Sequence, residues 1–196
     1  MAHGLQDFYK TATRYGFARD NLLRLGSITG NAGDGKPIFP SNESDKDFNI
    51  YLKTSSLPNR KINTAPVNFL SYSFNVPMEA EYPENNSFPV VFYCDKYYII
   101  RDIFERWSDS LYNEHTIAST TDFASCNLQL LLLDNSDANA TITNMSVIKK
   151  ITLFGCFPNN IGNISYDTSS NGNVVNVNAN LTFQYMTTET GPFNSN

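Results

Sequence analysis

The hydrophobic pattern of this chain is clearest in one helix and in the short apolar strand before it. The strand spans Phe88 to Tyr93. After it, apolar residues recur at the i, i+3, i+4, i+7 and i+11 positions of a helix, with charged residues between them. Asp95 stands where a side chain can cap the first turn. A helix of about 15 residues is marginal alone, so its apolar stripe predicts packing against a sheet. The predicted core residues of the helix are Ile100, Ile103, Phe104, Trp107 and Leu111.

Most of the remaining chain has the pattern of β-strands. Some segments alternate apolar and polar residues, and others are short apolar runs, of which Leu128–Leu133 is typical of a strand buried on both faces. The cleanest period-two pattern runs from Val175 to Tyr185. We expect a mainly β protein: an antiparallel β-sandwich or partial barrel with one packed α-helix, in a single domain over residues 1–196. The predicted strands include residues 21–28, 48–52, 88–93, 128–133, 147–157 and 175–185.

Two segments are expected to project from this domain. Leu57 and Pro58 interrupt a strand, and apolar alternation then resumes from Val67 to Met78, so residues 55–80 predict a long ribbon beyond the sheet. Residues 30–47 are rich in glycine, proline and charge, which predicts a surface insertion. The ribbon fits either a large loop, which is uncommon in a compact domain, or an arm that pairs with another subunit.

Composition and charge narrow the classes of function. The net charge of -5 argues against tight sequence-independent binding to DNA or to anionic lipid. The three cysteines, Cys94, Cys126 and Cys156, lie far apart and leave one unpaired in any disulfide scheme, which favours reduced thiols. The sequence has neither a signal peptide pattern nor a long apolar run. We therefore expect a soluble protein made in a cytoplasm, with no membrane partner.

Three short motifs are candidates for chemistry, and each lacks a required part. Residues 30–36 match most of a phosphate-binding loop, but Pro37 replaces the magnesium-binding hydroxyl and no helix follows. Glu114-His115 is a candidate for acid–base catalysis, as in a hydrolase, without a recognisable nucleophile. Asp134 and Asp137 lack the glycine and the distal glutamate of a calcium loop. We expect no enzyme activity, no cofactor and no metal site.

The polar face of the last predicted strand carries no charge. Such a face fits an ordinary solvent-exposed side of an antiparallel sheet, and it equally fits the wall of a channel where adhesion to the cargo would be harmful. The candidate residues are Asn176, Asn178, Asn180, Thr182 and Gln184.

Four segments, in this order, carry a resemblance to a known family. They are Asp20–Leu25; Leu57-Pro58 with Pro66–Phe69; Phe88–Asp95 followed by Tyr98, Ile99, Arg101, Phe104, Glu105 and Trp107; and Ile151–Pro158 with Ile161-Gly162 and Leu181–Tyr185. The chain resembles the tail tube proteins of contractile-tailed bacteriophages, which are related to the tubes of type VI secretion and other contractile injection systems. The segments cover about three quarters of the chain, and their order and spacing carry the resemblance.

The resemblance implies a phage tail tube fold and a structural role. Six copies would form a ring, and rings would stack into a tube through which DNA passes without specific binding. In such a tube the edge strands of one copy pair with the next. The other implied partners are a tail sheath protein and a baseplate tube initiator, in a virion assembled in the host cytoplasm. The residues expected to contact the adjacent ring are Leu57, Pro58, Val67 and Phe69, and the uncharged residues of the last strand are candidates for the lumen.

Two alternatives remain at this point. The chain could instead be a baseplate-proximal tube initiator or the tube of a secretion-type injector. More distantly, it could be a β-sandwich module that binds a carbohydrate or a receptor through exposed aromatic residues.

Overall fold

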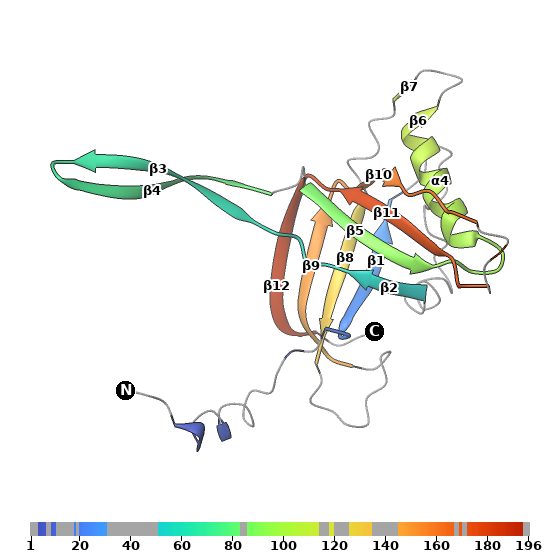
Figure 1. The fold of residues 1–196 in the computed structure, drawn as a ribbon, viewed down its shortest axis with the longest axis horizontal. Helices are drawn as coiled ribbons and strands as arrows, with labels where there is room; N and C mark the ends of the chain where they lie inside the picture. Colours follow the sequence, from blue (N-terminus) through green and yellow to red (C-terminus); the bar gives the residue numbers. More distant parts are fainter. Residues whose placement is uncertain are drawn as a thin grey trace.

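The computed structural model shows an antiparallel β-sandwich with a packed helix and a long projecting hairpin (Figure 1). It describes residues 4–6, 9–10, 18, 20–30, 51–82, 86–113, 118–119, 126–134, 145–166, 169 and 172–193. The mainly β fold class predicted from the sequence is confirmed.

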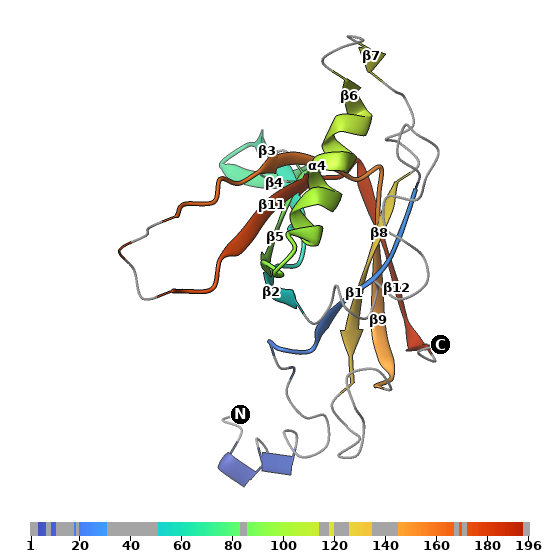
Figure 2. The same cartoon turned by 90° about the vertical axis from the view of Figure 1, so that its right-hand side faces the viewer.

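Two four-stranded sheets form the body, and all of their pairings are antiparallel. Figure 2 shows them as two layers that face each other, with α4 at one end of the space between them. The first sheet has the order β1 (Leu23–Thr29), β8 (Asn127–Leu133), β9 (Val147–Phe154) and β12 (Tyr185–Phe193). The second has the order β10 (Phe157–Ile161), β11 (Asn176–Thr182), β5 (Ser87–Tyr93) and β2 (Leu52–Ser55). Smaller elements are β3 (Lys61–Phe69), β4 (Tyr72–Glu81), β6 (Tyr112–Asn113) and β7 (Ala118–Ser119).

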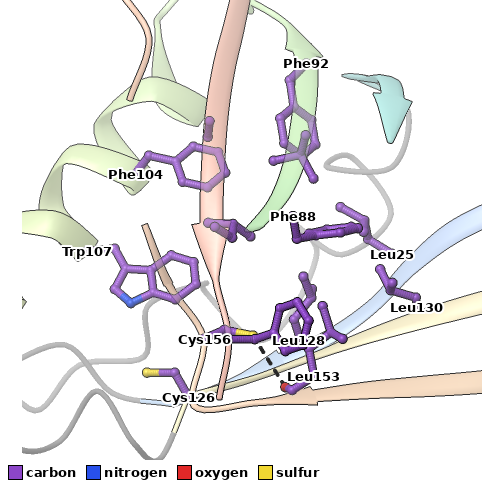
Figure 3. Packing of buried hydrophobic residues seen from close by; sticks show 14 of the residues in the cluster. Leu25, Phe88, Phe92, Phe104, Trp107, Cys126, Leu128, Leu130, Leu153 and Cys156 are labelled. Atoms are coloured by element: carbon purple, nitrogen blue, oxygen red, sulfur yellow. Dashed lines mark hydrogen bonds between the residues drawn. The ribbon is translucent and has the colours of Figure 1, made fainter. Parts of the chain in front are cut away.

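Helix α4 (Ile99–Leu111) packs its apolar stripe beside β10 and β11. Ile100, Ile103, Phe104 and Trp107 are buried, whereas Leu111, which the sequence pattern places in the core, is only half-buried at the end of the helix. Phe104 and Trp107 stack at 6.3 Å between ring centroids, and Figure 3 shows them facing Phe92 and Cys156 across the core. The helix therefore covers one end of the hydrophobic core.

Asp95 caps this helix, as its position in the sequence predicts. Its carboxylate accepts hydrogen bonds from the backbone N–H groups of Tyr97 at 3.0 Å and Ile100 at 3.2 Å. These donors lie before and inside the first turn, where no helical carbonyl is available to accept them. The cap fixes where the helix begins after β5.

The last predicted strand is wrong in its extent. The period-two segment from Val175 to Tyr185 is two strands in two sheets, because β11 ends at Thr182 and β12 begins at Tyr185. Between them the chain crosses from one layer to the other, and the Gln184 N–H donates to the carbonyl of Phe154 at 2.8 Å. Buried Phe183 keeps the apolar phase through the crossing, so alternation alone does not reveal the break.

A second crossing lies beside the first. The strand predicted over 147–157 ends at Phe154, and Gly155, with φ of 62°, turns the chain into β10 of the other sheet. Pro158 lies inside β10, directly after the end of the strand predicted over 147–157. A proline is tolerated there because β10 is the edge strand of its sheet.

Two other strand predictions need correction. Leu128–Leu133, predicted to be buried on both faces, has only Leu128, Leu130 and Leu133 buried and the others half-buried, because none of the described residues forms a layer over the outer face of its sheet. Of the strand predicted over 48–52, only residues 51 and 52 lie within the described residues, and β2 begins at Leu52.

The cysteines are free thiols, with Cys126 and Cys156 in the core and Cys94 half-buried. The Cys156 thiol donates a weak hydrogen bond to the carbonyl of Leu153 at 3.5 Å (Figure 3). Burial raises the pKa of Cys156 to about 12, so this thiol stays protonated at neutral pH. It acts as a small core residue and not as a nucleophile.

Replacing Trp107 tests the role of α4 in the core. Trp107→Ala removes the largest fully buried side chain and is expected to lower the free energy of unfolding by about 3–5 kcal/mol. Asp109→Ala, at an exposed position of the same helix, should change it by less than about 0.5 kcal/mol. Urea unfolding of both variants measures the difference. Equal stability of the two variants would contradict the packing described here.

Candidate assembly surfaces

The hairpin β3–β4 lies outside the two sheets of the body. Its strands pair with each other from Lys61 opposite Glu81 to Phe69 opposite Tyr72, and they form a separate two-stranded sheet. Figure 1 shows this ribbon extending far beyond the two layers of the body. An isolated two-stranded ribbon is at best marginally stable in water.

Both faces of the hairpin are open to solvent and rich in apolar side chains. Every residue of β4 is exposed, and no charged residue occurs from 62 to 78. Contiguous exposed apolar surface of this kind marks a protein–protein contact. The large apolar residues exposed on the hairpin are Ile62, Val67, Phe69, Leu70, Tyr72, Phe74, Val76 and Met78.

An ion pair closes the base of the hairpin, where the apolar segment ends. The Lys61 ammonium lies 2.8 Å from a carboxylate oxygen of Glu81, directly opposite it in the strand register. The hydrogen bond from Lys61 lowers the pKa of Glu81, and a hydrogen bond from Asn63 adds to this effect. Because both side chains are well exposed, the pair adds little stability.

The four residues predicted to contact the adjacent ring lie at two separate places. Leu57 and Pro58 lie between β2 and β3, at the base of the hairpin, and Leu57 borders a cavity of about 200 Å³ together with Tyr82 and Phe183. Val67 and Phe69 lie near the tip, both exposed. The structure therefore does not bring them into one patch. The other exposed apolar residues of β3 and β4 were not selected from the sequence, although their alternation was visible there.

The uncharged polar residues of β11 lie on the outer face of the second sheet. Asn176, Asn178, Asn180 and Thr182 are exposed or half-buried, and the residues between them are buried. They are paired with Tyr93, Val91, Pro89 and Ser87 of β5 in that order. The Ser87 hydroxyl donates to the side-chain carbonyl of Asn180 at 2.6 Å. Gln184 is exposed but lies beyond β11, in the crossing between the sheets, so it is not part of this row.

One lysine borders this otherwise uncharged face. The Lys53 ammonium donates to the side-chain carbonyl of Asn176 at 3.3 Å and lies 5.2 Å from the centre of the Tyr93 ring. An amide dipole and an aromatic face both favour a cation at this position. The charge is thus held against the sheet at the β2 edge.

The outer face of the first sheet is different in character. Arg24, Leu131, Lys150 and Glu189 form one row across its four strands, and Lys150 and Glu189 lie 3.4 Å apart. The rings of Phe154 and Tyr185 stack on this face at 4.6 Å between centroids. The two outer faces of the sandwich therefore present different surfaces to any partner, one with mixed charges and one dominated by asparagine.

The weaker chemical candidates fall largely outside the described residues. Glu114-His115, Asp137 and residues 31–36 of the glycine-rich segment lie outside them, as does most of the predicted insertion over 30–47. Within the part of the chain that the structure describes, no three His, Cys, Asp or Glu side chains gather as a metal site would require. Across the same residues, α4 is too short and too polar to cross a bilayer, and no longer helix is present.

Comparison with known proteins assigns the family. A family model described as phage tail tube protein matches residues 25–189, most of the chain. The chain belongs to the phage tail tube protein family, a family of structural tube proteins and not of enzymes. The resemblance seen in the sequence is thereby confirmed. No curated protein matches the sequence.

Solved structures share the fold at low sequence identity. A chain of the anti-feeding prophage baseplate aligns with a TM-score of 0.58 and 14% identity, covering 89% of this chain and 96% of that chain. A chain of the extended sheath–tube complex of PVC, an extracellular contractile injection system, aligns with a TM-score of 0.52 and 10% identity. The alignment covers 97% of this chain and 100% of that chain. A chain of the cap that terminates the anti-feeding prophage tube aligns with a TM-score of 0.53 and 11% identity, covering 89% of this chain and 92% of that chain.

Acid should loosen the base of the hairpin. The pKa of Glu81 is lowered in the folded chain, so its ion pair favours the folded hairpin above the unfolded glutamate pKa of about 4.3, and this contribution is lost as the pH falls through the lower folded value. Chemical shifts of the β3–β4 amides near Lys61, followed by NMR from neutral to acidic pH, should report this change. Glu81→Gln should abolish it, and an unaltered pH response in this variant would show that another group is responsible.

Proposed function

We propose that this chain is a structural subunit of a phage tail tube, that its copies form hexameric rings, and that the rings stack into a hollow tube that conducts DNA during ejection. The exposed hairpin β3–β4, which has no charged residue from 62 to 78, carries the proposal, because its apolar residues have no covering layer in the described chain. Family membership supports the structural role. The ring size and the passage of DNA are the parts proposed here.

Stacking places the hairpin against the adjacent ring. Val67 and Phe69 near its tip contact the next ring, and Leu57 and Pro58 at its base contact the same ring boundary from the body. Phe69 is 66% exposed in the single chain, so burying its side chain stabilises the contact by about 1.5–3 kcal/mol per copy before the entropy of association is subtracted. Six such contacts in each ring would act together, so two rings would bind each other far more tightly than a single contact would allow.

Ring closure uses the open edges of the sheets. In the described chain β1 and β12 are the edge strands of the first sheet, and they are seven and nine residues long. The edges of the second sheet, β2 and β10, are shorter, and β10 contains Pro158 and packs beside α4. Long open edges in a stable chain are satisfied by pairing with another copy.

The asparagine face of β11 is our candidate for the lumen. Asn176, Asn178, Asn180 and Thr182 carry no charge, and Gln184 lies at the end of the same segment. A neutral wall does not hold phosphates, so DNA moves along it without repeated release and capture of counterions. Lys53 at the border is held by Asn176 and Tyr93, which reduces its reach toward a passing strand.

The tube would contact two further kinds of protein. The PVC neighbour comes from a sheath–tube complex, and another neighbour comes from a baseplate. For this chain we propose a tail sheath around the tube and a tube initiator at the baseplate, in a virion assembled in the host cytoplasm. Because baseplate and cap chains share the fold, a terminal ring is the second candidate role. The number of copies in each particle separates a tube body from a terminal ring.

Removing the apolar hairpin tip should abolish stacking without unfolding the subunit. Electron microscopy of the purified chain, with an initiator complex if one is needed, is expected to show six-fold rings and tubes. The double variant Val67→Ser, Phe69→Ser should give rings or single subunits but no tubes, with an unfolding midpoint close to that of the parent, because both positions are exposed.

The matched control is Ile148→Ser, which changes an exposed apolar residue on the body instead of the hairpin. It should still form tubes. Normal tubes from the double variant, or a parent chain that stays a monomer even with an initiator, would contradict the proposal. In a map of the tube at side-chain resolution, β11 should face the lumen. A lumen lined by Arg24, Lys150 and Glu189 would place the other sheet there instead.

A further inference from the structure

The tip of the hairpin contains a residue in an unfavourable conformation. Phe69 and Tyr72 are paired, so the turn between them consists of Leu70 and Ser71. Leu70 has φ of 54°, in the left-handed region. Two-residue hairpin turns normally place glycine, asparagine or aspartate at such a position, because a larger side chain crowds the backbone there.

Leu70 is also unfavourable in its exposure. At 87% it is the most exposed large apolar residue in the described part of the chain. A leucine at this site therefore raises the free energy of the unassembled chain in two ways. Its backbone is in an unfavourable conformation, and its apolar side chain is in contact with water. Local rules of this kind are broken mainly where function requires it. The side chain at the tip is thus a candidate anchor for a partner.

At the other end of the molecule lies an open cleft of about 520 Å³ with tyrosines on its walls. The Tyr166 hydroxyl donates to the Tyr98 hydroxyl at 2.9 Å, which ties the segment after β10 to the start of α4. Arg101 forms an ion pair with Glu105 at 2.6 Å and donates to the carbonyl of Gly162 at 3.0 Å. Arg101 and Glu105 are thus paired with each other, Asp102 is the third charged residue of the lining, and the two walls of the cleft are connected before any partner binds.

Exposed apolar side chains lie close to this cleft. Tyr97 and Ile99 flank Tyr98 in the sequence, and Val174 lines an adjoining pocket that shares Ile164 and Tyr166 with the cleft; all three are more than half exposed. Ile164 lines the cleft itself and packs against the core cluster. A branched aliphatic side chain entering the cleft would contact the rings of Tyr98 and Tyr166 and the stem of Arg101, which are suitable apolar neighbours.

The two surfaces lie at opposite ends of the longest axis. In Figure 1 the hairpin extends to one side, while β5 runs away from it and leads into the start of α4 at the other side. A contact between two different surfaces at opposite ends is heterologous, so each copy can donate its hairpin to one neighbour and receive the hairpin of another. Such a contact repeats without limit along a stack.

We propose that Leu70 anchors the hairpin of one copy in the Tyr98–Tyr166 cleft of a second copy. The proposal rests on the proposed function and adds the receiving surface and the anchoring side chain. Asparagine accepts the left-handed conformation far better than leucine and lacks the apolar branch. Leu70→Asn is therefore expected to have opposite effects on the free subunit and on the assembly.

The test compares Leu70→Asn, Tyr166→Ala and the double variant, with Ser71→Ala as the matched control at the neighbouring turn position. Sedimentation gives the lowest concentration at which each chain assembles, and thermal unfolding of dilute chain gives its midpoint. Each single variant should raise the assembly concentration at least about tenfold, as expected for loss of a buried apolar contact. The double variant should be no worse than the poorer single variant, since both remove one contact.

The unfolding midpoint of Leu70→Asn should equal or exceed that of the parent, and Ser71→Ala should assemble normally. Assembly of either single variant at the parent concentration would overturn the proposal while leaving the tube function intact. Fully additive effects would show that the tip and the cleft bind different surfaces, which also overturns it. A parent chain that never assembles would instead reject the proposed function.

Discussion

A ribbon of two strands cannot cover either of its own faces, and this constraint governs how the molecule works. The body has no such problem, because its two sheets and α4 enclose the side chains of Phe88, Phe92, Phe104 and Trp107. The hairpin β3–β4 leaves that core and exposes every residue of β4. A chain can retain this much exposed apolar surface when a partner covers it, and the family membership makes a second copy the natural partner.

The base of the projecting hairpin is joined to the sheets of the body. The hairpin lies in the chain between β2 and β5, and β5 is an interior strand of its sheet, paired on both sides. Its base is therefore joined to the body, and Lys61 and Glu81 pair where the strands leave it. In the proposed assembly the body would not need to rearrange, which would confine the entropic cost of association to the hairpin.

Sequence patterns predicted those parts of the fold that depend on which side of an element is buried. The helical stripe and the alternation in β11 report burial directly, and Asp95 reports a cap through its position alone. The two crossings between sheets were missed because Phe183 and Cys156 remain buried as the chain changes layer. The order of strands in each sheet depends on contacts between distant segments, which no local pattern encodes.

The candidate surfaces were predictable to a similar degree. The ribbon segment and the polar face were visible as patterns, but the separation of Leu57 and Pro58 from Val67 and Phe69 depends on the length of the paired hairpin. The unusual turn at Leu70 gives no signal in sequence, because Leu-Ser is not a typical turn pair. The tyrosine cleft requires the chain after β10 to return to α4, which only the three-dimensional structure shows.

Hydrogen exchange of the hairpin amides, measured in dilute chain and in assembled tubes, tests the central claim most directly. If another copy covers the hairpin, the amides of β3 and β4 exchange rapidly in the dilute chain, while those of β8 and β9 are protected, and the hairpin becomes as protected as the body on assembly. Equal protection of the hairpin in the two states would contradict the claim, because the ribbon would then need no partner.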